Sequence, residues 1–273
     1  ILRGAGTVGY LLAVSLTLAA FFLPAVGWQY ARGTLPPLHP EGLMYYLLAG
    51  LVTGSLAPFF STMATRHIGA AQTTAIRLLD PLFAFVIGLL FLREQVSAAV
   101  VIGTVLIAGG LAVLQIDQRR PPSLRSEAGW LSAGILFAIG ASLLWTVGSA
   151  LRKSGLAVIP SPVLSAGSEG LAGMAAMAAV ATVTHRWGEV RQVFSRAHLD
   201  VWLSAATAAF GTYFLNFALQ TLPLPVAVAL RNTSPWFALF LTPVLLGARH
   251  RPSGLVWLST LLLSGGMLLI LMR

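Results

Sequence analysis

The sequence predicts an all-α integral membrane protein with nine transmembrane helices. Of its 273 residues, 57% are hydrophobic and only 9% are charged, whereas a soluble domain carries about 25% charged residues. The apolar residues also stand in continuous runs long enough to cross about 30 Å of hydrocarbon. A transmembrane strand would instead alternate apolar and polar residues over about ten positions, so helices are predicted rather than a barrel.

The predicted helices follow one another with short connections. In chain order they cover residues 8–29, 43–64, 70–92, 97–115, 129–151, 161–184, 201–220, 223–247 and 254–272. These runs leave no room for a soluble catalytic or nucleic-acid-binding domain. The net charge of +9 is therefore interpreted as basic residues facing anionic lipid headgroups, with no nucleic-acid partner.

Two parts of the chain share a sequence pattern. Residues 75–85 (AIRLLDPLFAF) and 229–239 (ALRNTSPWFAL) share R-x-x-x-P-x-F-A, which places Arg77 opposite Arg231 and Pro81 opposite Pro235. After a slip of two residues, GTVLIAGGL at 103–111 matches STLLLSGGM at 259–267. The chain therefore contains an internal repeat of a proline-bearing helix followed by a helix with a Gly-Gly step.

Counting helices from these anchors defines two repeats within one membrane domain. The first repeat, 1–118, holds four helices and the second, 126–273, holds five, so a counterpart of 129–151 is expected to be absent at the N-terminus. The full design is then two five-helix repeats. An odd number of helices per repeat places the halves in opposite orientations, as in many secondary transporters.

Four ionisable residues fall at helix depth, where a charge costs about 2.5 kcal/mol or more. They are Arg77, Asp80, Glu169 and Arg231. Arg77 and Asp80 are three residues apart and share one helix face, so they can neutralise each other. Arg231 has a serine at that spacing, and Glu169 is therefore the expected partner of Arg231.

Pro81 and Pro235 interrupt the two helices that carry the buried arginines. Each proline lacks the N–H that would bond the carbonyl four residues earlier, which frees the carbonyls of Arg77 and Arg231. Such breaks at corresponding positions of two halves indicate a binding site near the bilayer midplane. The alternative interpretation is a pair of simple kinks with structural ion pairs.

Polar and aromatic residues at helix depth complete a candidate substrate site. Its members are Arg231, Glu169, Arg77, Asp80, Asn216, Asn232, Trp145, Tyr213 and Trp236. Arg231 is the strongest candidate to bind a substrate carboxylate, and Glu169 either neutralises it in the empty site or takes a coupling proton. Each tryptophan also fits a packing role. The sequence contains no cysteine, H-E-x-x-H or Walker motif, so no metal, cofactor or catalytic residue is expected.

Several segments resemble a known family. The acidic turn Leu92-Arg93-Glu94 after a proline helix, the run from Gly103 to Gly110 and the sequence LLWTVGSALRK at 143–153 are similar to the drug/metabolite transporter (DMT) superfamily, in particular its EamA-type members. The resemblance implies a secondary transporter in a bacterial inner membrane that works by alternating access and exports its substrates. Its expected substrates are small amphipathic metabolites, with amino acids as the main expectation. Its expected partners are the substrate, membrane lipids and a coupling proton. A membrane enzyme and a channel without a transport cycle remain the alternatives.

Overall fold

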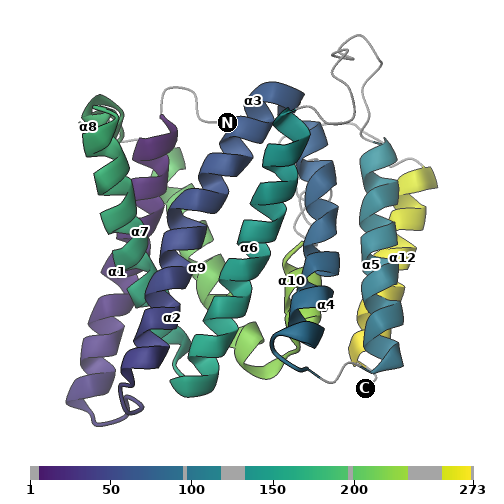
Figure 1. Ribbon diagram of the computed structural model, residues 1–273, viewed down its shortest axis with the longest axis horizontal. Coiled ribbons are helices and arrows are strands. Elements are labelled where there is room, and N and C mark those ends of the chain that lie inside the picture. The colour runs from purple at the N-terminus through teal and green to yellow at the C-terminus, as the bar shows by residue number, and fades with distance from the viewer. Residues whose placement is uncertain (1–5, 95–96, 118–132, 196–198, 233–253, 272–273) are drawn as a thin grey trace. The chain divides into compact units, whose positions relative to one another are not determined.

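A computed structural model describes residues 6–94, 97–117, 133–195, 199–232 and 254–271, and this part of the chain is helical without strands (Figure 1). Four of its helical segments are long and apolar enough to cross a membrane: Thr7–Ala31, Pro40–Gly69, Ala133–Val158 and Pro162–Val183. The segments Asp80–Leu90 and Ala98–Gly110 are shorter apolar helices. The all-helical membrane fold is therefore confirmed, whereas the count of nine spans stays a prediction, because 223–247 lies largely outside the described residues.

The chain divides into two compact units. The first unit contains residues 1–62 and 147–222, and the second contains residues 63–146 and 223–273. Each unit thus combines residues from both predicted repeats. Two helices, α3 (Ala57–Ile76) and α6 (Ala133–Val158), contribute residues to both units.

The first unit is built around α1 and α7. Its elements are α1 (Thr7–Ala31), α2 (Pro40–Leu51), the π-helical turn η1 (Val52–Leu56), parts of α3 and α6, α7 (Pro162–Val183), α8 (Trp187–Ser195) and α9 (Leu199–Thr221). Helix α7 begins where Ser161 caps it, because the Ser161 hydroxyl accepts the Leu164 N–H at 3.2 Å and Pro162 suits the first helical position.

Glycines on α2 and α7 allow α7 to approach its neighbours to backbone contact distance. A Cβ added to Gly170 would lie 2.6 Å from the backbone nitrogen of Ala19 on α1. A Cβ added to Gly50 on α2 would lie 2.7 Å from the Cα of Glu169. Small residues permit this close approach of membrane helices, and the approach of α2 fixes the surroundings of Glu169.

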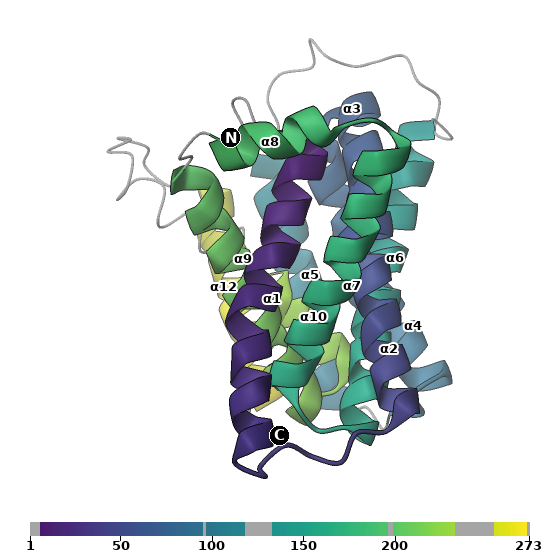
Figure 2. The same cartoon turned by 90° about the vertical axis from the view of Figure 1, so that its left-hand side faces the viewer.

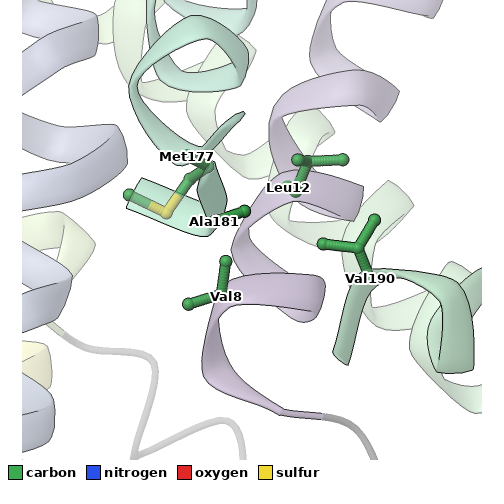
Figure 3. Close-up of a cluster of buried hydrophobic side chains, with 5 residues drawn as sticks. All are labelled: Val8, Leu12, Met177, Ala181 and Val190. Atoms are coloured by element: carbon green, nitrogen blue, oxygen red, sulfur yellow. The ribbon is translucent and has the colours of Figure 1, made fainter. Parts of the chain in front are cut away.

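The short helix α8 closes one end of this unit. Figure 2 shows α8 lying across the N-terminal end of α1, and the Glu189 carboxylate accepts the Val8 N–H at 3.2 Å. A cluster of buried apolar side chains joins α1, α7 and α8 (Figure 3): Val8, Leu12, Met177, Ala181 and Val190. Apolar packing of Val190 therefore holds α8 against α1 and α7. The Glu189 carboxylate of α8 adds a contact with the positive N-terminal end of α1.

The second unit packs its helices in two pairs. Its elements are parts of α3 and α6, the 3-10 turn η2 (Arg77–Leu79), α4 (Asp80–Leu90), α5 (Ala98–Asp117), α10 (Leu224–Arg231) and α12 (Gly254–Leu271). Helix α5 lies beside α12, and α4 contacts α10 (Figure 1). In each pair, one helix comes from the first predicted repeat and the other from the second.

Contacts between α5 and α12 are reciprocal with respect to the predicted repeat. A Cβ added to Gly110 would lie 3.0 Å from the Ser259 carbonyl oxygen, and one added to Gly266 would lie 2.6 Å from the Gly103 carbonyl oxygen. The repeat aligns Gly110 with Gly266 and Gly103 with Ser259. Each member of one contact is thus equivalent to a member of the other, as at an isologous interface.

Two helix boundaries differ from the sequence prediction. Helix α3 runs across the expected gap between 64 and 70, and its break is a single residue, Gly69, whose φ of +82° suits glycine. Helix α6 ends at Val158, where the sequence predicted residue 151. The polar segment 152–155 continues the helix, so the predicted end at residue 151 was wrong.

Candidate substrate site

The second unit contains a charge cluster around Asp80. Pro81 has no N–H to donate to the backbone hydrogen bonds of a helix. After α3 the chain therefore forms the 3-10 turn Arg77–Leu79, and α4 begins at Asp80. The side chain of Asp80 is 0% exposed. It lies in the first turn of α4, where the helix dipole favours a negative charge.

Two arginines share the Asp80 carboxylate. Arg231 Nη2 lies 2.8 Å from Asp80 Oδ2, and Arg77 Nη2 lies 3.5 Å from the same oxygen. The predicted pairing of Arg77 with Asp80 is confirmed. The predicted pairing of Arg231 with Glu169 was wrong, because α10 packs against α4 and brings Arg231 to Asp80.

Helix α6 supplies the other contacts of Asp80. The Ser142 hydroxyl donates to Asp80 Oδ1, and the Thr146 hydroxyl donates to the Asp80 carbonyl oxygen at 3.4 Å. Trp145 lies between them in sequence, and the guanidinium carbons of Arg77 and Arg231 are 5.6 and 5.7 Å from its ring centroid. These distances fall within the usual range of about 6 Å for a cation above an aromatic ring.

The carbonyl group of Arg77 also has a role in this cluster. It accepts the Asp80 N–H within the 3-10 turn and the side-chain amide of Asn232 at 3.5 Å. This is the carbonyl that Pro81 was predicted to release from the helical ladder. The corresponding Pro235, and with it the candidate Trp236, lie outside the described residues.

Charge in this cluster is unbalanced. Within the described part of the second unit, two guanidinium groups share one carboxylate, which gives the cluster a formal charge of +1. The arginine side chains are also accessible, 34% for Arg77 and 19% for Arg231, whereas Asp80 is closed to solvent. The cluster therefore presents positive groups that an anion can approach.

Glu169 lies in a different cluster, within the first unit. Its Oε2 is 2.8 Å from Arg152 Nη2, and its Oε1 accepts from the Ser165 hydroxyl at 3.1 Å and from the Asn216 amide at 3.3 Å. Arg152 Nη2 also donates to the Thr53 hydroxyl at 2.9 Å. Both charged side chains are only 3% exposed, and the pair is neutral overall.

Arg152 is the buried residue that the sequence prediction missed. A signal for it exists on α6, where four polar residues recur at intervals of four, three and three positions. They are Ser142, Thr146, Ser149 and Arg152, and all are buried. This spacing keeps them near one helix face, so the stripe indicates that Arg152 continues a buried polar face.

The remaining candidate, Tyr213 on α9, belongs to an apolar cluster of the first unit. Its ring stacks on Phe22 with centroids 5.1 Å apart and an interplanar angle of 18°. The structure thus places five of the nine predicted site residues in the second-unit cluster: Arg77, Asp80, Trp145, Arg231 and Asn232. Glu169 and Asn216 form part of the first-unit cluster.

An all-helical chain with apolar spans and buried charge clusters is typical of a membrane protein that passes several times through the bilayer. The model of the EamA-like transporter family matches residues 6–116 and 132–272. The chain therefore belongs to the EamA-like transporter family, a part of the DMT superfamily whose members are transporters.

Comparison with solved structures supports the same fold. A crystal structure of a protein 20% identical in sequence matches with a TM-score of 0.69, covering 96% of this chain and 88% of that chain. The comparison with curated proteins found no match.

Proposed function

We propose that this transporter is a secondary transporter that exports amino acids or similar small amphipathic metabolites by alternating access. Its proposed location is the inner membrane of a bacterial cell. The observation that carries the proposal is the Asp80 cluster, in which Arg77 and Arg231 share one carboxylate beside Trp145. A group with a surplus positive charge in an apolar protein requires a counter-ion, and a substrate carboxylate supplies one.

In this proposal the guanidinium groups bind the carboxylate of the substrate. A guanidinium offers a planar fork of N–H donors that matches a carboxylate in two parallel hydrogen bonds. Arg77 is the more accessible arginine and its contact with Asp80 is the longer one. We therefore assign the first contact with substrate to Arg77, with Arg231 held by Asp80 as the second donor.

Two observations favour alternating access over a channel or a membrane enzyme. The reciprocal contacts of Gly110 and Gly266 are what a two-fold relation between α5 and α12 produces. The family model also matches in two stretches, 6–116 and 132–272, which correspond to the predicted repeats 1–118 and 126–273. In secondary transporters, inverted repeats support rocking of one half against the other, and we propose the same mechanism for this chain.

Glu169 is the proposed acceptor of a coupling proton. Its carboxylate is buried on α7, and Arg152 is the charged group paired with it. Proton uptake would remove the negative partner of Arg152, which gives a chemical route from protonation to rearrangement of the first unit. The accompanying donors are Ser165 and Asn216.

Counterflow of labelled leucine and phenylalanine in proteoliposomes tests the proposed function. A carrier gives saturable uptake that is accelerated by unlabelled amino acid inside, whereas a channel gives flux that rises linearly with concentration. An enzyme would convert the label chemically. Arg77→Gln should abolish counterflow, and Arg32→Gln serves as the matched control, because Arg32 also lies over an indole, 4.2 Å from the Trp28 ring centroid, but is exposed at the end of α1.

A further inference from the structure

The positive charge of the Asp80 cluster is not offset by the chain that follows Arg231. Residues 233–253 contain no aspartate or glutamate. The carboxylate that Arg77 and Arg231 contact is that of Asp80, and Glu169, the other acidic residue predicted at helix depth, is paired with Arg152. The formal charge of +1 therefore describes the cluster before substrate binds.

The Asp80 carboxylate is closed to a substrate ammonium group, because its side chain is 0% exposed. Both arginines occupy Oδ2, Ser142 donates to Oδ1, and Thr146 donates to the carbonyl oxygen. The cluster is thus surrounded by donors and supplies positive groups. An ammonium group that enters beside two guanidinium groups meets electrostatic repulsion from both of them.

From this balance we infer that the site selects its ligand by net charge and binds monocarboxylates that carry no amino cation more tightly than zwitterionic amino acids. A monoanion brings the cluster to zero, a zwitterion leaves it at +1, and a dianion takes it to −1. Uncompensated charge is costly in a low-dielectric environment. We therefore expect the highest affinity for the ligand that brings the net charge of the cluster to zero, which is the monoanion. The inference rests on the proposed function, since it describes the substrate class of the same site.

Leucine, N-acetyl-leucine and leucine methyl ester test the inference, because they share a side chain and carry net charges of 0, −1 and +1. Thermal stabilisation of the purified full chain in detergent measures their apparent Kd, and the phenylalanine series repeats the test with a larger side chain. N-acetyl-leucine should bind about tenfold more tightly than leucine, because it brings the cluster to zero net charge and places no ammonium group beside the arginines. The ester should not bind.

Two variants change the charge of the cluster in opposite directions. Asp80→Asn keeps the shape of the side chain and takes the cluster to +2, so it should shift the preference towards the dianion N-acetyl-aspartate. Arg77→Gln takes the cluster to zero and should remove the advantage of N-acetyl-leucine over leucine. If Asp80→Asn does not fold, Arg77→Gln still tests the inference independently. Arg32→Gln should leave the order of affinities unchanged.

The outcomes separate this inference from the proposed function. Equal affinities for leucine and N-acetyl-leucine, with counterflow still abolished by Arg77→Gln, would overturn the charge selectivity and leave the transporter site in place. Binding of the ester as tight as that of the acid would overturn it in the same way. Absence of both counterflow and binding for all probes would overturn the proposed function and the inference together.

Discussion

Arg231 Nη2 lies 2.8 Å from Asp80 Oδ2, although 151 positions separate the two residues in sequence. The contact joins the last residue of α10 to the first residue of α4, so it connects the proline-bearing helices of the two predicted repeats. Because Arg77 contacts the same oxygen at 3.5 Å, the carboxylate neutralises one arginine while two are present. We therefore expect Arg231, which makes the shorter contact, to contribute more to stability, and Arg77, which is more exposed, to make the first contact with an anion.

Replacement of the two arginines should separate these roles. Arg231→Gln removes the closer of the two arginine partners of a fully buried carboxylate and should lower the free energy of unfolding by about 1–3 kcal/mol. Arg77→Gln removes a longer and more exposed contact and should cost less stability. Arg77→Gln should abolish counterflow and Arg231→Gln should reduce it at least about tenfold, since each removes one donor for the substrate carboxylate. Normal transport by Arg231→Gln with a lowered unfolding temperature would make Arg231 a structural residue only.

Glu169 and Arg152 should behave as a coupled structural pair. Glu169→Gln leaves the buried Arg152 without a counter-ion, and removing one partner of a buried pair typically costs about 3–5 kcal/mol. The double variant Glu169→Gln, Arg152→Gln should recover part of that loss, so the two changes are not additive. Unfolding of the four proteins in detergent measures the coupling.

The same set of variants examines the corrected pairing of Arg231. Since Glu169 contacts Arg152 and not Arg231, Glu169→Gln should leave the order of affinities for leucine and N-acetyl-leucine unchanged. A change in that order would mean that Glu169 influences the anion site. Strictly additive losses in stability would mean that the pair contributes no coupling.

The helices and part of the site followed from local patterns. Apolar runs predicted most helices to within a few residues, and the i, i+3 spacing predicted the contact of Arg77 with Asp80. Pro81 predicted the break that the structure shows as a 3-10 turn. Each of these features depends on residues within about one helical turn, and such interactions can be derived from a single sequence.

Long-range pairing could not be derived in this way. The partner of Arg231 depends on which helix α10 packs against, and two buried carboxylates were available in the sequence. Arg152 was missed because α6 continues through a polar segment after its apolar run ends. Tertiary packing decided both cases, and the polar stripe on α6 was the local signal that bears on Arg152.

Substitution of neighbouring glycines should test the contact of α5 with α12. A Cβ on Gly110 or Gly266 would lie within 3.0 Å of a backbone carbonyl oxygen of the facing helix, whereas a Cβ on Gly109 or Gly265 meets nothing within 4 Å among the described residues. We therefore expect Gly110→Ala and Gly266→Ala to lower the unfolding temperature. Gly109→Ala and Gly265→Ala should raise stability by up to about 1 kcal/mol through helix propensity.

The adjacent pairs share a helix and differ in the direction of the side chain, so each glycine has its own control. Equal effects of Gly110→Ala and Gly109→Ala would contradict the close approach of the two helices. Similar losses for Gly110→Ala and Gly266→Ala are expected, because their contacts are reciprocal.

Glu94 should influence anion binding through α10. Its Oε2 accepts the Leu224 N–H at 2.8 Å, at the first residue of α10, where Pro223 provides no side-chain cap and Pro225 has no N–H. Arg231 is the last residue of this eight-residue helix. A carboxylate at the N-terminus therefore stabilises the helix that carries Arg231.

Glu94→Ala should thus lower the free energy of unfolding by about 1 kcal/mol and raise the apparent Kd for N-acetyl-leucine, because α10 no longer holds Arg231 as firmly against Asp80. Glu94→Gln retains an oxygen acceptor and should restore most of the affinity. Glu41→Ala is the control, since Glu41 is an exposed acid in the first turn of α2. If Glu94→Ala destabilises the protein but leaves the affinity for N-acetyl-leucine unchanged, Glu94 caps α10 without positioning Arg231 for the substrate.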